Sequence, residues 1–456
     1  MKTWKLFMII ITVIFGMAYA QLSLAAISAE EAKQLGKTLT HFGAEMAGNM
    51  DGTIPAYTGG LTTPPANYKA GSGYRPDPFA AEKPLFSINA QNMAQYADKL
   101  TEGTKGLMKQ YPTFRIDVYK THRTVAYPEF VLNQTVKIAQ KAKTTNEGLS
   151  LEGAHAGYPF PIPKTGYEAM WNHLVRYQGR SLYSKNVTNL VDSRGKIIPS
   201  AEITIWREWP YYDLDMTRDE TRQGIFWKIR WIFTAPARKA GEAGQATDPV
   251  DMYKNNRVAY QYLPGQRRTK LAPQIAFDTP STDGGGEFTY DETWVFNGSM
   301  ERYDWKLLGK KEMYVPYNTY RAIYTVSKNE LYGPNHWNPD VVRWELHRVW
   351  VVEATLKPNK RHIYKTRRYY LDEDSWTAVA ADMWDANGIL FKADYSFLHQ
   401  LYDLKCPSSL SFAVYNLINR IYICAYPTGP SGFIRENEVL SEKWWSPDMM
   451  ASMGER

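Results

Sequence analysis

Several features are scarce in this sequence, and each scarcity excludes a class of protein. The 456 residues include only two cysteines, Cys406 and Cys424. Glycine (31) and proline (26) are close to average, which excludes a collagen-like or low-complexity chain. The net charge of +7 is spread along the chain without clusters of Lys and Arg. No nucleic-acid partner is therefore expected.

Long apolar runs are missing after the N-terminus. An apolar run over residues 6–17 follows Lys2 and Lys5, and small residues such as Ala18-Tyr19-Ala20 come next. This pattern predicts a signal peptide over residues 1–26, cleaved after about residue 20–26. The alternative, an uncleaved anchor, needs a longer span than this run provides. No cysteine lies near these sites, so we expect a soluble, exported protein without a lipid anchor.

Catalytic motifs are absent too. The sequence has no G-x-S-x-G, no P-loop, no H-E-x-x-H and no dinucleotide fingerprint. Its eight histidines are scattered, and their spacing predicts no metal site. Asp291-Glu292 and Asp372-Glu373-Asp374 are interpreted as solvated surface rather than paired acid and base. We therefore predict no catalytic residue, no metal and no cofactor.

The two cysteines lie eighteen positions apart in the exported part of the chain. In an oxidising compartment, such a pair predicts one disulfide between Cys406 and Cys424. Closing that loop would stabilise the fold by about 3 kcal/mol. A catalytic cysteine is the alternative interpretation.

Aromatic residues, in contrast, are abundant at 14% of the chain. From about residue 181 to 402 they recur with a period of two, which indicates β-strands. Asn297-Gly298 and Asn387-Gly388 are typical of hairpin turns. Successive hairpins predict an antiparallel meander. The apolar faces of its strands are Ile225, Trp227, Ile229, Trp231 and Phe233; Phe288, Tyr290, Trp294 and Phe296; Tyr303, Trp305 and Leu307; and Val342, Trp344, Leu346, Trp350 and Val352.

Helices are fewer. Ser28 and Glu31 have the spacing of a capping box, which predicts a short helix at residues 28–39. A Gly/Pro/Tyr-rich segment over 43–84 is expected to extend across the body. Thr165 and Glu168 predict a second capped helix near 165–177. The resulting organisation is a helix and extended segment over 27–110, followed by a sheet domain over 111–456.

Several motifs together resemble one family of Gram-negative proteins. The N-terminal signature runs from Gly36 to Gly60, and it includes Asp51-Gly52-Thr53-Ile54-Pro55-Ala56-Tyr57. The sequence is similar to the family named domain of unknown function 1329, over nearly the whole exported chain. The further matching segments are 160–163, 262–268, 303–305, 347–354 and 370–374.

The resemblance implies a fold and a setting. It implies a mainly β protein with some α, in which a large antiparallel sheet curls into an open (half) β-barrel similar to LolA and LolB. Helices are expected to cover or plug the concave face. The family is associated with transporters of the resistance-nodulation-division type, and it has no established catalytic residues to carry over.

Two functions follow as alternatives. The first is a periplasmic carrier for a lipid, a lipoprotein acyl chain or another hydrophobic molecule, working with an inner-membrane transporter or an outer-membrane protein. The second is an adaptor that docks onto such a membrane protein and has a filled interior. An enzyme that acts on lipids is a third hypothesis. For the carrier, the predicted apolar lining is Trp227, Ile229, Trp231, Trp294, Trp344 and Trp350.

Overall fold

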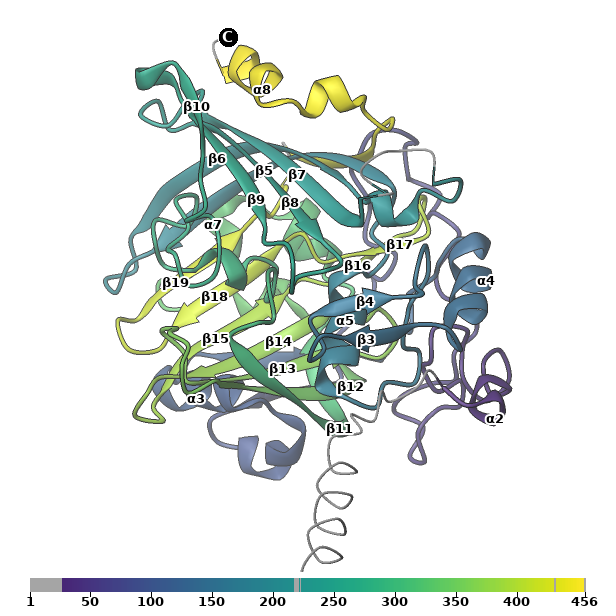
Figure 1. Ribbon diagram of the computed structural model, residues 1–456. Coiled ribbons are helices and arrows are strands. Elements are labelled where there is room, and N and C mark those ends of the chain that lie inside the picture. Colours follow the sequence, from purple (N-terminus) through teal and green to yellow (C-terminus); the bar gives the residue numbers. More distant parts are fainter. Residues whose placement is uncertain (1–26, 217–220, 222, 430–431, 455–456) are drawn as a thin grey trace, which may run out of the picture.

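The computed structural model describes residues 27–216, 221, 223–429 and 432–454, so the predicted signal peptide lies outside the described residues. Strands dominate, and short helices and loops connect or cover them (Figure 1). Among the described residues, no helix is both long and apolar enough to cross a membrane.

The chain begins with short elements that surround the sheet. In chain order they are α2 (Ala29–Ala32), β1 (Phe86–Asn89), η1 (Met93–Lys99), α3 (Glu102–Gln110), β2 (Arg115–Val118), α4 (Glu129–Ile138), β3 (Lys143–Thr145), β4 (Ser150–Glu152) and α5 (Gly166–Leu174). The capping box predicted from Ser28 and Glu31 is present at α2.

The remaining elements build most of the sheet. The first group is β5 (Ser181–Val191), β6 (Ile197–Glu208), η2 (Pro210–Tyr212), β7 (Ile225–Ala235), β8 (Ala243–Pro249), β9 (Val258–Leu263), η3 (Pro264–Gln266), β10 (Arg268–Leu271), η4 (Tyr290–Glu292), β11 (Tyr303–Pro316), η5 (Arg321–Thr325), α7 (Lys328–Leu331) and η6 (Pro339–Val341). The second is β12 (Arg343–Leu356), β13 (Thr366–Asp372), β14 (Ala378–Trp384), β15 (Leu390–Ser396), β16 (His399–Leu401), β17 (Cys406–Ser408), β18 (Phe412–Asn416), β19 (Ile421–Ala425), β20 (Phe433–Glu436), η7 (Glu442–Trp445) and α8 (Pro447–Gly454).

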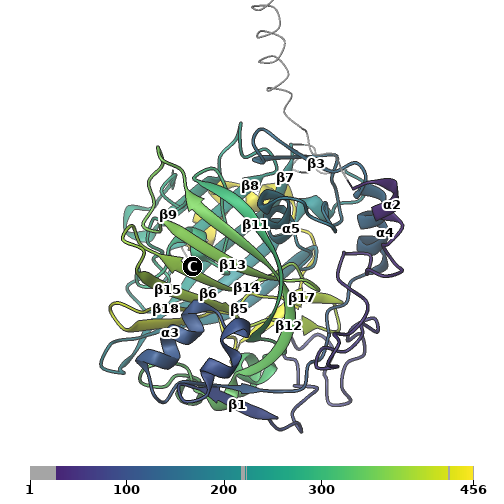
Figure 2. The ribbon, with the colours of Figure 1, turned by 90° about the horizontal axis from the view of Figure 1, so that it is seen from below.

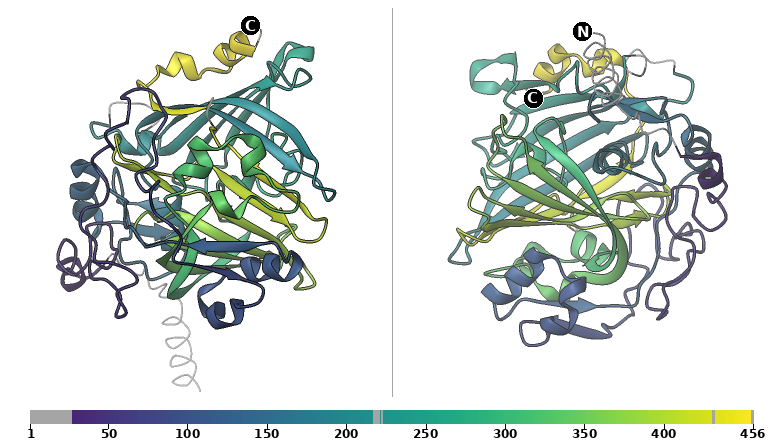
Figure 3. Two further views of the ribbon diagram at one scale, coloured as in Figure 1. Left: turned by 180° about the vertical axis from the view of Figure 1, so that it is seen from behind. Right: turned by 60° about the horizontal axis from the view of Figure 1, so that its bottom comes forward.

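Sixteen strands form one large sheet in the order β1-β2-β12-β13-β14-β15-β18-β19-β5-β6-β7-β8-β9-β10, with β11 added on β12 and β20 on β5. All neighbours are antiparallel except β2, which is parallel to β12. The sheet curves around an interior, and within the described chain its two ends do not pair (Figures 1 and 3). The predicted fold class, a mainly β protein with a large open sheet, is confirmed.

Two long strands each have a divided edge. β12 pairs with β11 along one edge, and its other edge is divided between β2 and β13. β5 similarly pairs with β6 along one edge and divides the other between β19 and β20. Each of these strands therefore has two neighbours along one edge, so the sheet branches there.

Both faces of the sheet are covered. On the convex face, α3 packs on β15 and β14 (Figure 2), and η7 with α8 covers β7–β10. Lys228 and Arg230 lie on this outer face of β7, as the alternation predicts, but the C-terminal indoles of Trp444 and Trp445 bury them. The concave face is the side that looks into the interior.

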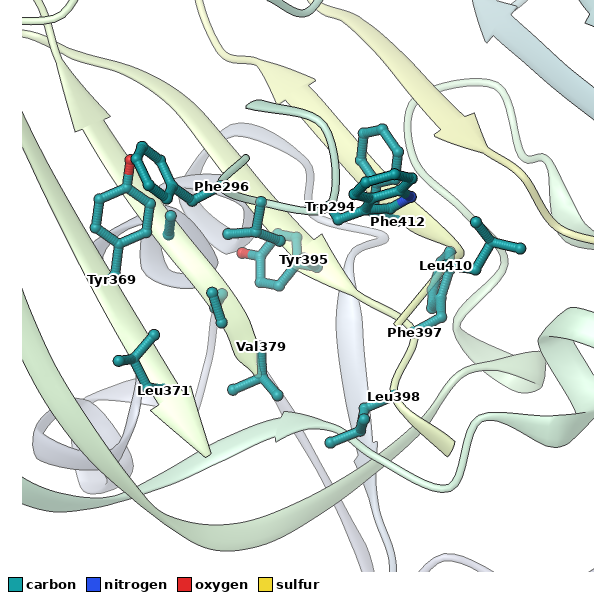
Figure 4. Close-up of a cluster of buried hydrophobic side chains, with 14 of the residues drawn as sticks. Trp294, Phe296, Tyr369, Leu371, Val379, Tyr395, Phe397, Leu398, Leu410 and Phe412 are labelled. Atoms are coloured by element: carbon teal, nitrogen blue, oxygen red, sulfur yellow. The ribbon is translucent and has the colours of Figure 1, made fainter. Parts of the chain in front are cut away.

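One predicted strand is wrong. Phe288–Phe296 was expected to form a strand that turns at Asn297-Gly298, but residues 272–302 form a loop with the single turn η4. This plug segment, as we call 272–302, lies on the concave face, where Trp294 and Phe296 pack near Tyr369 and Phe412 (Figure 4). Its aromatic side chains are core, although its backbone does not join the sheet.

The helix predicted near 165–177 is α5, and it occupies the interior. Gly166 and the seven residues from Glu168 to Leu174 are buried. His173 connects three elements: its Nδ1 accepts a hydrogen bond from Ala378 N (3.0 Å), and its Nε2 donates to Phe296 O (2.9 Å). Burial, helped by the charge of Arg176, lowers the pKa of His173 well below its usual range. The imidazole is therefore neutral, as these two bonds require.

We predict that His173→Ala destabilises the protein by about 3 kcal/mol, because it leaves a buried N–H and a buried C=O without partners and opens a cavity. Urea denaturation followed by tryptophan fluorescence measures the change. His41→Ala is the control, since His41 is half-buried and outside this contact. Equal stabilities of the His173 and His41 variants would contradict the assigned role.

The predicted disulfide is not formed in the structure. Cys406 and Cys424 are both free and buried. Cys406 lies in β17 and pairs with Leu401 of β16, in a separate two-stranded sheet. Cys424 lies in β19 and pairs with Ala413 and Asn189 in the large sheet. The two residues thus belong to different sheets, which spacing along the chain does not reveal.

Both thiols should therefore be present but unreactive in the native protein. Burial raises the pKa of each thiol well above its usual value, and the thiolate is the reactive form. We expect mass spectrometry after iodoacetamide treatment without reductant to show no label on native protein and two labels after unfolding. If the denatured chain takes up no label, the two cysteines are linked by a disulfide and the expectation of free thiols is wrong.

Candidate functional site

The concave face holds an apolar pocket between the sheet and the plug segment. Ile203 and Ile205 come from β6, and Trp227, Ile229 and Trp231 come from β7. In each strand these residues alternate, so all of them point to the same face. Ile275, Tyr290 and Trp294 of the plug segment close the opposite side. The pocket encloses about 50 Å³, and its volume is about 500 Å³ when the open solvent at its mouth is included.

The two indoles at the centre are fixed by neighbouring groups. The rings of Trp227 and Trp294 meet edge to face, with centroids 5.6 Å apart. The Trp227 indole N–H donates to Asp248, which also binds Arg257 through two bonds of 2.8 and 2.7 Å. Trp227 is therefore held in place, because its indole N–H is paired with a carboxylate that is itself bound to Arg257.

The wall at Trp231 depends on a glycine. Gly244 of β8 lies opposite Trp231 in the register, and a Cβ at Gly244 would come within 2.1 Å of the indole. The indole therefore lies directly over the backbone of β8. Only glycine leaves room for this arrangement.

The backbone of the plug segment is strained beside the pocket. Trp294 and Val295 have φ values of +57° and +73°, in the left-handed region. This region is unfavourable for a β-branched residue such as Val295. The surrounding packing maintains this conformation, which turns the Trp294 side chain toward Trp227.

Polar groups lie at the rim. Asp283 accepts hydrogen bonds from the Ser281 and Tyr426 hydroxyls, and burial raises the pKa of its carboxyl. Asn297 and Arg257 complete this side, 3.2 Å apart. The pocket therefore combines an apolar wall with a few polar atoms, a composition typical of small-molecule sites.

The six residues predicted to line one site are not all brought together. Trp227, Ile229, Trp231 and Trp294 line the pocket. Trp344 is buried elsewhere, 5.6 Å from Tyr395, and Trp350 stacks on Trp376 at 6.2 Å. Ile203 and Ile205 were missed, although the alternation of apolar residues in β6 could have identified them.

The acidic pair in the plug segment is buried, so its interpretation as solvated surface was wrong. Asp291 binds Arg367 Nη1 at 2.8 Å and His362 Nε2 at 3.0 Å. Glu292 binds Lys392 Nζ at 3.1 Å. Burial alone would raise the pKa of Asp291, but Arg367 and His362 lower it strongly. These ion pairs fix the plug segment on β13 and β15.

The second acidic group is buried too, which corrects the same interpretation. Asp374 binds Arg123 through two bonds of 2.9 and 2.6 Å, and Glu373 binds Lys310 at 2.9 Å. Asp372, Asp374 and His347 each place a ligand atom within 4.8 Å of the others. Because Arg123 occupies both oxygens of Asp374, this cluster acts as an ion-pair network that ties the N-terminal segment to the sheet.

Asp372 should make the stability of the protein depend on pH. Burial raises the pKa of the Asp372 carboxyl to about 7, and the nearby charge of Asp374 adds to the increase. An exposed aspartate has a pKa of about 3.9, so the folded state holds an extra proton between these values. The stability from Asp372 is therefore complete below about pH 4 and is lost as the pH rises to about 7.

We expect Asp372→Asn to remove this titration, so its free energy of unfolding should rise relative to wild type from pH 4 to 7. The upper limit is about 1.4 kcal/mol per pH unit. Urea denaturation at several pH values tests this, with Asp304→Asn as control because that side chain is 70% exposed. If the free energies of unfolding of wild type and Asp372→Asn change with pH in parallel, Asp372 is not the group that titrates.

Comparison with known sequences identifies the family. The profile of the family described as protein of unknown function (DUF1329) matches residues 87–451. The uncharacterized protein PA3922 of Pseudomonas aeruginosa is 40% identical over 408 residues, which is 88% of each chain. The chain therefore belongs to this family, which confirms the resemblance seen in the sequence.

Several solved structures have detectable similarity to this chain, among them three bacterial proteins. A domain named for outer membrane lipoprotein sorting, from Vibrio parahaemolyticus, is 15% identical, covers 63% of this chain and 98% of its own, and has a TM-score of 0.43. A DUF1329 family protein from Desulfovibrio piger is 13% identical, with coverages of 62% and 95% and a TM-score of 0.41. The LolA superfamily protein NE2245 from Nitrosomonas europaea is 10% identical, with coverages of 63% and 100% and a TM-score of 0.38.

Proposed function

We propose that this protein is a periplasmic carrier or binding protein for a lipid or another hydrophobic molecule. The observation that carries the proposal is the apolar pocket on the concave face, formed by β6, β7 and the plug segment. Its walls are mostly apolar, with a few polar groups at the rim, which is the usual composition of a small-molecule site. The signal-like N-terminal sequence supports export to the periplasm.

Binding in such a pocket needs no directional chemistry. Each buried methylene of a ligand contributes about 0.8 kcal/mol, and part of this offsets the cost of association. A chain of ten or more carbons can thus bind with useful affinity and still be released. These properties suit a carrier that receives its cargo from one membrane protein and delivers it to another, such as a transporter of the resistance-nodulation-division type.

Native mass spectrometry of protein purified from the periplasm, followed by organic extraction, tests the proposal. We expect a co-purified apolar molecule, or exchange with an added one. Trp231→Ala should weaken binding of an added long-chain alcohol about 10-fold, since it removes a large part of the apolar wall.

Trp206→Ala is the matched control for that variant. Trp206 is a half-buried tryptophan on neighbouring β6, but it faces outward toward Tyr183 and Trp444. Its loss should leave ligand affinity unchanged. The carrier function would be refuted if neither native nor added apolar ligands bind, or if the two variants lose affinity equally.

A second candidate is an adaptor that docks onto a membrane protein. The observation that favours it is the filled interior, where α5 and the plug segment bury most of the concave face. Crosslinking in cells followed by purification separates the two. Recovery of only ligand-free protein bound to a membrane transporter would favour the adaptor.

A further inference from the structure

Buried arginines in this protein usually pair with a carboxylate. The pairs are Arg75 with Asp403, Arg123 with Asp374, Arg343 with Glu345, Arg348 with Glu373 and Arg367 with Asp291. Arg176 and Arg207 are equally buried, but among the described residues neither has a carboxylate partner. They are the exceptions on the concave side of the sheet.

Arg207 interrupts the apolar face of β6. It follows Ile203 and Ile205 in the alternation, and in the register it lies between Leu182 of β5 and Ile229 of β7. Its guanidinium carbon is 5.4 Å from the centroid of the Trp209 ring and 5.7 Å from that of Trp294. Its Nε and Nη2 are buried and have no hydrogen-bond partner within the described chain.

Arg176 approaches from the C-terminal end of α5. Its Nη1 donates to His173 O at 2.5 Å and its Nη2 to Ser409 Oγ at 3.2 Å, which leaves Nε without a partner in the described chain. Arg176, Trp209 and Trp294 line a small cavity. This cavity adjoins the apolar pocket, because Trp227 and Trp294 line both.

The electrostatics of this corner are unfavourable without a ligand. Burial, together with the charge of Arg176, lowers the pKa of Arg207 to about 9. Burial lowers the pKa of Arg176 to about 10. Both groups therefore remain cationic at neutral pH. An unpaired buried charge is costly, and water can accept hydrogen bonds from these groups but cannot neutralise them.

We infer that Arg207 and Arg176 form the anion-binding end of the apolar pocket, so that the ligand is an amphiphile with an oxyanion headgroup and an apolar tail. This inference rests on the proposed function and specifies its ligand class. The guanidinium fork of Arg207 suits the two oxygens of a carboxylate or phosphate monoester. The indole N–H of Trp294, which is also buried without a partner, supplies a further donor.

From this headgroup site, the ligand tail extends into the apolar pocket. Trp227 and Trp294 mark the passage, and beyond them the walls are Ile203, Ile205, Ile229 and Trp231. Arg176 thus lines one end, with the Arg207 guanidinium packed against the Trp294 ring, and apolar walls lie at the other end. A neutral lipid would occupy the apolar part but leave both arginines unpaired.

The test compares chains of equal length with different headgroups. Saturated carboxylates and alkyl phosphates of 8–18 carbons are titrated into the full protein by calorimetry at pH 7.5, beside the matching alcohols. At least one acid series should bind 10-fold or more tightly than the alcohols. The comparison of carboxylates with phosphates identifies which oxyanion is preferred.

Arg207→Met tests the residue itself. It keeps an unbranched apolar stem and removes the charge, so the affinity for the acids should fall about 30-fold or more, while that for alcohols changes less than 3-fold. The ligand-free variant should melt at a higher temperature than wild type, because an unpaired buried charge is gone. A purely structural arginine would give a lower melting temperature.

Arg230→Met is the matched control. Arg230 is a buried arginine on adjacent β7, but on the outer face, where it binds Gln245 and Ser446 O. Its removal changes the net charge equally and should not alter the preference for acids. Arg207→Lys should retain part of the preference, since it keeps the charge but loses the planar fork.

Three results would overturn the inference, and they are distinct. If alcohols and acids bind equally well, and Arg207→Met changes neither affinity, the anion site is refuted. The proposed carrier function is then still supported. If acetate or inorganic phosphate binds as tightly as the long-chain acids, the site is a simple anion site without a tail. If no member of any series binds, the proposed function falls with it.

Discussion

Asp291 lies buried between Arg367 of β13 and His362, and Glu292 beside it binds Lys392 of β15. These contacts hold the plug segment on the concave face, which would otherwise expose a wide apolar surface to water. Trp294 reaches Trp227, and Phe296 reaches α5 through His173, only because the segment is fixed at this point. The pocket is therefore the part of the interior that the segment leaves unfilled.

The interior is divided by this arrangement into two halves of different character. Against β13–β15 the buried cations Arg367 and Lys392 are paired with Asp291 and Glu292 of the plug segment, and the packing is that of a core. Against β6 and β7 the walls are apolar, and no carboxylate in the described part of the chain pairs with Arg176 or Arg207. A structure that pairs its buried arginines in one half and leaves two unpaired in the other is organised for an external anion.

The strands could be predicted well from the sequence, because alternation reports which face each residue occupies. The strands at 225–235 and 343–356 and the helix at 166–174 agree with the predictions. The plug segment was mistaken for a strand because its aromatic residues have the spacing of one. Asp291 and Asp372 were mistaken for surface because their partners, Arg367 and Tyr317 among them, become neighbours only in the fold. Within the site, the wall residues of β7 could be predicted from the alternation. Arg207 could be recognised only as a charged residue at a position of β6 where the alternation predicts an apolar one.

Two edge strands of the open sheet, β11 and β10, differ from ordinary strand edges. β11 carries a bulge at Leu307–Gly309 and the lysines Lys306, Lys310 and Lys311, while β10 is four residues long and contains Arg268 and Lys270. Bulges, lysines and short length all disfavour the addition of a foreign strand. The sheet can thus remain open without offering a template for aggregation. A partner protein would accordingly have to recognise side chains on the surface of this molecule rather than extend its sheet.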